Sequence, residues 1–259
     1  MQGDWLVPDW PAPASVCAVC TTRQGGVSLP PYDSLNLGDH VGDDPAAVAR
    51  NRALLARALG ARPVFLQQVH GSGVAQLAAT TPDGTQADGC VATQAGTACT
   101  IMVADCLPVL FADTQGRAVA AAHAGWRGLA GTHGQGVLET TVQAFWSALH
   151  SGGAEAAGRT LAWLGPCIGP RAFEVGDEVR LAFVAQHAGA AAMFRPHAAG
   201  KWLADLQGLA RLRLSALGIT QVHGNDGSDA WCTVANASRF FSHRRDRVSG
   251  RFAASIWLR

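Results

Sequence analysis

The chain has 259 residues, of which 48% are hydrophobic and 15% are charged. This balance predicts an ordered globular protein with a substantial core and excludes a disordered chain. With 20 basic and 19 acidic residues, the formal net charge of +1 gives no electrostatic basis for nucleic-acid or membrane-surface partners.

The start of the chain and the cysteines indicate the compartment. Residues 1–5 lack the basic and apolar stretches of a secretory signal, and Asp, His or Gly interrupts each apolar run before the roughly 18 residues that a membrane span needs. The seven cysteines are an odd number for a disulfide framework, which favours free thiols or metal ligands. We therefore expect a soluble, cytoplasmic protein with no membrane partner.

Apolar runs and turn residues predict the elements in chain order. Strands are expected at 16–22, 63–69, from about 74, and at 97–104, 107–112, 118–122, 161–164, 221–223 and 253–258. Helices are expected at 45–59, with Asp44 as N-cap and Gly60 as the stop, and at 128–149, 177–186 and 201–217. Segment 151–158 is interpreted as a surface loop. Because strands and helices mix without regular alternation, we expect an α/β or α+β fold, a mixed β-sheet core flanked by helices.

Three potential metal ligands, His70, Cys106 and His123, each follow an apolar strand at the point where it ends. Strand ends are where a rigid element presents a side chain to a cleft. Two imidazoles and one thiolate suit Zn²⁺ with a fourth position open for water or substrate. Their spacings do not match a zinc finger, so separately buried cysteine and histidine side chains are the alternative interpretation.

Other residues near these positions allow two interpretations each. Asp105, if extended, points away from Cys106 and either orients a ligating histidine or accepts from backbone donors at a turn. Arg127 either contacts an anion near the metal or forms a structural ion pair. In the segment 240–245, two aromatic residues before two arginines favour either base stacking with a phosphate contact or a core strand with a basic turn. Cys17 and Cys20 would point to opposite faces of a strand, which favours core residues over a redox pair.

Several strings together resemble one family, the YfiH-type proteins, which are also called polyphenol oxidase or laccase-domain proteins. The strings are Thr22-Arg-Gln-Gly-Gly-Val-Ser28, Ser34-Leu-Asn-Leu-Gly38, Asn51-Arg52, Gln68-Val-His-Gly71, Ala104-Asp-Cys-Leu-Pro108, His123-Ala-Gly-Trp-Arg-Gly128, Gly165-Pro-Cys-Ile-Gly169, Phe173-Glu-Val-Gly176 and Phe240-Phe-Ser-His-Arg-Arg245. They run in order from about residue 16 to the end. The sequence departs from the family pattern at His243, where tyrosine is common, and at Cys17 and Cys20.

The resemblance implies a single α/β domain over residues 1–259, with its core from about residue 16. It also implies that His70, Cys106 and His123 are the metal ligands, usually of zinc; the older oxidase label implies copper. With Asp105, these three form the expected catalytic set. We expect substrate contacts from the residues of the shared strings that carry amide or guanidinium groups, namely Asn36, Arg52, Arg127 and Arg244.

The family's activities set the functional expectation. They include phosphorolysis of the purine nucleosides adenosine, inosine, guanosine and methylthioadenosine, and deamination of adenosine. Other members are described as peptidoglycan editing factors that remove a misplaced L-Ser from cell-wall precursors. We therefore expect a zinc enzyme whose partners are a small nucleoside and phosphate. A metal-free hydrolase with a Cys–His pair and a metal-carrying binding module are the alternatives.

Overall fold

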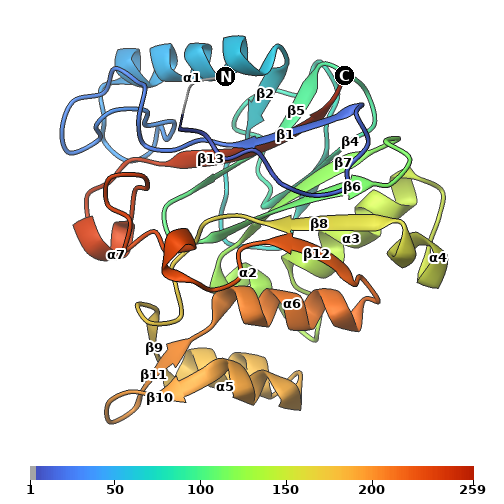
Figure 1. Ribbon diagram of the computed structural model, residues 1–259, viewed down its shortest axis with the longest axis vertical. Helices are drawn as coiled ribbons and strands as arrows, with labels where there is room; N and C mark the ends of the chain where they lie inside the picture. Colours follow the sequence, from blue (N-terminus) through green and yellow to red (C-terminus); the bar gives the residue numbers. More distant parts are fainter. Residues whose placement is uncertain (1–3) are drawn as a thin grey trace.

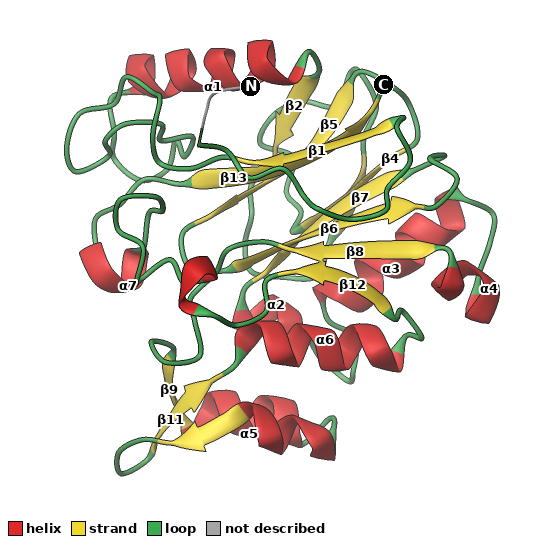
Figure 2. Ribbon diagram, viewed as in Figure 1, coloured by secondary structure: helices red, strands yellow, loops and turns green. Residues whose placement is uncertain are grey.

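Two β-sheets pack face to face at the centre of the molecule, and helices cover their outer faces (Figures 1 and 2). The computed structural model describes residues 4–259. Residues 1–3 lie outside it; they belong to the N-terminal segment that was expected to lack a signal peptide. The first sheet has the strand order β1 (Val16–Cys20), β13 (Phe252–Leu258), β5 (Thr97–Val103) and β2 (Arg62–Phe65). The second has the order β12 (Gln221–Gly224), β8 (Thr160–Leu164), β6 (Leu107–Asp113), β7 (Val119–Ala124), β4 (Gly89–Ala92) and β3 (Val74–Gln76).

Both sheets mix parallel and antiparallel pairs. In the first sheet only β2 and β5 run parallel, and in the second the two edge pairs, β12–β8 and β3–β4, do so. A small third sheet, with the order β10 (Phe194–Pro196), β11 (Lys201–Ala204) and β9 (Glu174–Gly176), lies at one end of the molecule (Figure 1). The predicted mixed α/β fold is confirmed.

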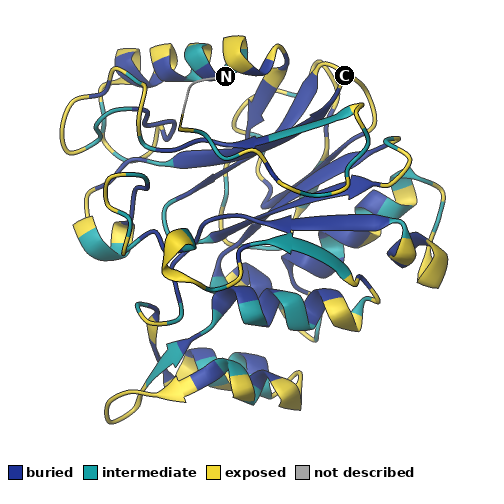
Figure 3. Cartoon of the chain, in the orientation of Figure 1, coloured by how far each residue is buried: buried dark blue, intermediate teal, exposed yellow. Residues whose placement is uncertain are grey.

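Strand residues alternate between two cores because successive side chains of a strand point to opposite faces. In β5, Cys99 and Ile101 face the second sheet, whereas Ala98 and Met102 face the helix on the other side. Every residue of β5, β6, β7, β8 and β13 is buried, so these strands are dark blue along their length in Figure 3. Burial on both faces explains why their sequences are continuous apolar runs rather than alternating ones.

The helices form the two outer layers. They are α1 (Pro45–Leu59), α2 (Trp126–Ala130), α3 (Val137–Ala148), α4 (Gly153–Gly158), α5 (Asp177–Val184), α6 (Leu206–Ala216) and α7 (His243–Asp246), with 3-10 turns at Ala188–Met193 and Asp229–Trp231. Helix α1 packs on the first sheet, and α3 and α6 pack on the second. No helix within residues 4–259 is long and apolar enough to cross a membrane. All seven cysteines are free thiols.

The predicted helix at 45–59 is confirmed together with its signals. The Asp44 side chain accepts a hydrogen bond from the Ala46 amide, and Pro45 occupies the first turn, where no intrahelical donor is needed. Gly60 ends the helix with φ +63°, a left-handed conformation that glycine adopts without steric cost.

Four local predictions are wrong. The loop expected at 151–158 contains α4, and the strand expected at 63–69 ends at Phe65. The helix expected at 201–217 begins with strand β11, because its first residues pair with β9, and α6 starts only after Asp205, whose side chain accepts from the Gly208 amide. The helix expected at 128–149 is two helices, α2 and α3, because Gly131 ends the first with φ +62°. Strand β4 was not predicted.

A buried ion pair joins α3 to α6, and breaking it should destabilise the fold. Arg213 Nε lies 2.7 Å from Glu139 Oε1, and the two side chains are each 9% exposed. We expect Arg213→Leu to lower the free energy of unfolding by about 3–5 kcal/mol, because the Glu139 carboxylate would remain buried without its partner. The control Arg159→Leu breaks a pair with the exposed Glu155 and should cost about 1 kcal/mol or less. Urea unfolding of both variants measures the difference, and equal losses would contradict the prediction.

Candidate active site

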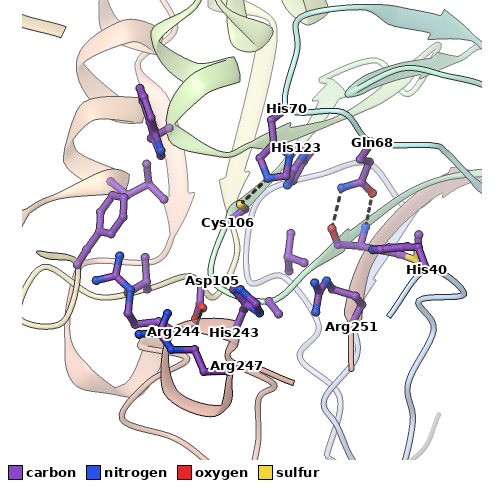
Figure 4. Close-up of a pocket in the computed structure, with 17 residues that line it drawn as sticks. His40, Gln68, His70, Asp105, Cys106, His123, His243, Arg244, Arg247 and Arg251 are labelled. Carbon is purple, nitrogen blue, oxygen red and sulfur yellow. Dashed lines mark hydrogen bonds between the residues drawn. The ribbon is translucent and has the colours of Figure 1, made fainter. Parts of the chain in front are cut away.

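The three predicted ligands lie close together in the folded chain. Their donor atoms all lie within 4.8 Å of one another. Cys106 Sγ is 3.7 Å from His70 Nε2, and the rings of His70 and His123 meet edge to face with centroids 4.7 Å apart (Figure 4). Two imidazole nitrogens and one thiol sulfur at this separation are a donor set that could hold a metal ion, with one side open to the cavity.

Strand register and two glycines place these donors. Antiparallel pairing sets Pro108 of β6 opposite His123 of β7, so Cys106, two residues earlier, lies close to that histidine. A Cβ at Gly125 would lie 2.8 Å from the His70 ring and 3.0 Å from Cys106 Sγ. A Cβ at Gly128 would lie 2.6 Å from the Gly71 carbonyl oxygen. Both glycines of the segment 123–128 are therefore needed for the chain to pass this close to the donors.

The side chain that orients the site is Asp88, which the sequence analysis missed. It is fully buried just before β4, and its Oδ1 lies 2.8 Å from His123 Nδ1. The same carboxylate accepts hydrogen bonds from the backbone amides of His70, at 2.9 Å, and Gly71, at 2.7 Å. His70 has φ +60°, an uncommon conformation that these bonds hold in place. Asp88 thus positions two of the three donors, as carboxylates behind metal-binding histidines do.

Asp105 has a different role from the histidine-orienting one that was an alternative for it. It has φ +92°, so it is not extended, and the expected opposition to Cys106 does not apply. Its carboxylate accepts from the Thr233 hydroxyl at 2.6 Å and from the Arg244 amide at 2.7 Å. The second alternative proposed backbone donors at a turn; the donor found is in helix α7, so Asp105 fastens the start of α7 to the segment that carries Cys106.

The half-buried Cys106 and the buried His123 shift each other's pKa values. Burial raises the pKa of the Cys106 thiol, but the neighbouring His123 and His70 outweigh it and lower that pKa to about 6. Burial lowers the pKa of His123, and Cys106 and Asp88 together raise it to about 9. The thiolate is the form of cysteine that binds metals and attacks electrophiles, so Cys106 is in a reactive form near neutral pH.

A cavity of about 580 Å³ opens beside these donors, a volume typical of small-molecule sites. Its apolar wall is formed by Trp126 of α2, Ile168 and Phe173 from the connection after β8, and Leu206 of α6. Its basic rim comes from the loop before α1 and from the C-terminal turn around α7, and consists of His40, His243, Arg244, Arg247 and Arg251 (Figure 4). The cavity therefore combines metal donors, an apolar wall and several cationic groups.

Of the four expected substrate contacts, only Arg244 lines this cavity. Asn36 is buried, where its Nδ2 donates to Asp43 and its Oδ1 accepts from the Arg251 amide. Arg52 donates to the Leu37 carbonyl, pairs with Asp39 and stacks on Phe65. Both side chains hold loops behind the cavity wall.

Arg127 also lies outside the lining, although it belongs to α2. Its side chain is exposed and its guanidinium carbon stacks 4.5 Å from the centre of the Trp126 ring. Neither the structural ion pair nor a contact with the donors is found for it among residues 4–259. Arg247 and Arg251 line the cavity instead, and only their closeness to the predicted segment 240–245 could have suggested them.

Comparison with known proteins assigns the family. The family model described as multi-copper polyphenol oxidoreductase laccase matches residues 17–259. A Pseudomonas aeruginosa protein and Escherichia coli YfiH, both named purine nucleoside phosphorylase, are 54% and 51% identical to this chain and match over 98% of each chain. The crystal structure of a Neisseria meningitidis protein superposes with a TM-score of 0.90 at 46% identity over 99% of each chain, and that of YlmD from Geobacillus stearothermophilus with 0.87 at 31% over 100% of this chain and 97% of the other. The chain therefore belongs to the multi-copper polyphenol oxidoreductase laccase family, the YfiH-type family that its motifs resemble.

Proposed function

We propose that this chain is a zinc-dependent purine nucleoside phosphorylase that also deaminates adenosine. The proposed substrates are adenosine, inosine, guanosine and methylthioadenosine, with inorganic phosphate as the second substrate. One observation carries the proposal: the three donors open into a 580 Å³ cavity with an apolar wall and a basic rim. The purine nucleoside phosphorylase names of relatives that share about half of the sequence support it.

The donor set fits zinc. Two imidazoles and a thiolate are common zinc ligands, and Asp88 holds His123 in the orientation that such a site needs. A bound zinc ion would supply a Lewis acid with one open coordination position. The family description suggests copper, and a His₂Cys set can bind copper as well, so copper is the alternative metal. Zinc is proposed because the donors leave one side open to the cavity, as catalytic zinc sites do.

The apolar wall suits a purine. Trp126 and Phe173 contribute aromatic surface to the cavity, and Ile168 and Leu206 contribute aliphatic surface. A planar heterocycle gains both buried apolar area and stacking energy on such a wall. This arrangement favours a nucleoside over a purely polar substrate such as a sugar or a short peptide.

The phosphate contact is proposed at Arg251. Its Nη1 donates to the carbonyl oxygens of Ser249 and Gly250, and it forms no ion pair among residues 4–259. Burial lowers the pKa of Arg251, while the nearby Cys106 and Asp105 partly oppose that shift. A half-buried guanidinium without a carboxylate partner is stabilised by a bound anion. Held there, a phosphate oxygen would bond to the anomeric carbon as the glycosidic C–N bond breaks and the base leaves with a proton.

Phosphorolysis gives the first test of this function. Purified zinc-loaded protein should release hypoxanthine from inosine only when phosphate is present, and it should convert adenosine to inosine slowly. Arg251→Ala should raise the KM for phosphate about tenfold or more, because a charge-assisted contact is lost. The exposed Arg57→Ala is the matched control and should have wild-type constants. Absence of both reactions, together with release of L-Ser from a UDP-MurNAc-L-Ser precursor, would establish the editing amidase instead.

Metal removal distinguishes zinc chemistry from the metal-free Cys–His alternative, which the lowered pKa of Cys106 and its 3.7 Å contact with His70 favour. We expect a strong chelator to abolish activity and added zinc to restore it in protein that stays folded. His70→Ala, Cys106→Ala and His123→Ala should each lower zinc content and activity together. Full activity in metal-free protein, with a covalent adduct trapped on Cys106, would show that Cys106 acts as a nucleophile without metal.

Replacing Asp88 tests the orientation of the ligands. Asp88→Ala should weaken zinc binding by about 10- to 100-fold, because His123 loses its orienting acceptor and the loop at His70 loses its backbone contacts. Asp113→Ala is the control, since it also removes a buried carboxylate, at the Arg117 pair, away from the donors. Zinc affinity is measured by competition with a chromophoric chelator. Equal zinc affinity in the two variants would mean that Asp88 only stabilises the fold.

A further inference from the structure

The cavity is lined by more cationic side chains than the binding of one phosphate ion requires. Arg244, Arg247 and Arg251 all line it, and none of them forms an ion pair within residues 4–259. Asp105 is the only carboxylate among the lining residues, and both of its oxygens already accept hydrogen bonds, from Thr233 and from the Arg244 amide. Three guanidinium groups therefore face a common space with little compensation, which favours a ligand set with more than one anionic group.

The cations form two separate groups. In Figure 4, Arg244 and Arg247 lie together on one side of His243, and Arg251 lies on the other side, toward His40. The first group belongs to α7 and the turn that follows it, and Arg251 belongs to the segment before β13. A single phosphate bound by Arg251 leaves the other two arginines without an anion.

Hydrogen bonds hold the backbone of the turn that carries Arg244 and Arg247. Ser242 caps α7 by accepting from the Arg245 amide, and the Arg245 side chain donates to the Thr233 and Phe240 carbonyl oxygens. With Asp105 holding the Arg244 amide, these bonds anchor the turn on both sides.

The guanidinium groups themselves remain available. That of Arg244 makes one hydrogen bond, to the Glu174 carbonyl oxygen, and stacks 5.7 Å from the Phe173 ring centre. That of Arg247 makes none within residues 4–259, and the side chain is exposed at the rim. Anchored backbone with free guanidinium groups is an arrangement suited to binding a phosphate monoester.

We propose that Arg244 and Arg247 bind a phosphate carried by the substrate itself, so that the site accepts nucleoside 5′-monophosphates and prefers them to nucleosides. The proposal rests on the phosphorylase function proposed above and adds a substrate class to it. In the reaction, an oxygen of inorganic phosphate bonds to the anomeric carbon, and the glycosidic C–N bond breaks. Its electron pair and a proton go to the departing purine. The sugar product carries the original 5′-phosphate and a new phosphate at the anomeric carbon.

The test compares inosine with inosine 5′-monophosphate on zinc-loaded protein, first at low and then at saturating inorganic phosphate. Hypoxanthine release should show a kcat/KM at least about tenfold higher for the monophosphate, as two charge-assisted contacts predict. Arg247→Ala should lower that ratio about tenfold, and Arg57→Ala, an exposed arginine on α1, should leave it unchanged. Binding of both ligands is measured by calorimetry under the same phosphate concentration, so that a preference is detected even without turnover.

The outcomes separate this inference from the function on which it rests. Turnover of inosine without any preference for the monophosphate overturns the inference and leaves the phosphorylase standing. Tighter binding of the monophosphate without release of base from either ligand removes the phosphorylase and keeps the second anion subsite. A preference that disappears as inorganic phosphate is raised would show that the monophosphate only occupies the Arg251 subsite, and it too overturns the inference.

Discussion

The Asp88 carboxylate, buried between the sheet and the loop at His70, is the contact on which the whole site depends. It accepts from one imidazole ring and from consecutive backbone amides, so one side chain fixes the separation of His70 and His123. Although burial raises the pKa of Asp88, the His123 ring and the amides of Gly71 and Val69 outweigh it and lower that pKa. The carboxylate thus stays ionised with no guanidinium or ammonium partner among residues 4–259, and both histidines keep a ring nitrogen for the side that faces Cys106.

The layered fold explains how such a contact can be rigid. Strands β6 and β7 are buried on both faces, and their register fixes Cys106 relative to His123 before any ligand binds. Close passage of the chain at Gly125 leaves no room for a side chain between the donors. The metal donors are therefore set by the core of the protein, whereas the cationic rim is set by loops that the core only supports.

The sequence predicted those parts of the structure in which local signals and tertiary packing agree. Helix α1 was found because Asp44 and Gly60 mark its ends. His70, Cys106 and His123 were found because each follows an apolar run, although β2 ends at Phe65 and His123 lies inside β7. Strand β11 was missed because both of its partners, β10 and β9, are only three residues long and neither forms a recognisable apolar run. Its own four residues also run directly toward a helix, so they were assigned to that helix. Asp88 gave only a weak signal, a single carboxylate before a short buried strand.

For the arginines, the sequence alone does not predict which side chains line the cavity. Arg52, Arg127 and Arg251 all lie in or near recognisable strings, yet one supports a loop, one stacks on the surface and one lines the cavity. The difference lies in backbone direction: Arg251 precedes β13, whose pairing with β5 carries it to the edge where Cys106 also emerges. Because the rim side chains come from the loop before α1 and from the segment 243–251, and the donors come from other segments, changes in the rim can alter substrate choice without replacing the metal ligands. His243, which also lines that cavity, is one of the positions at which the sequence was expected to depart from the family pattern.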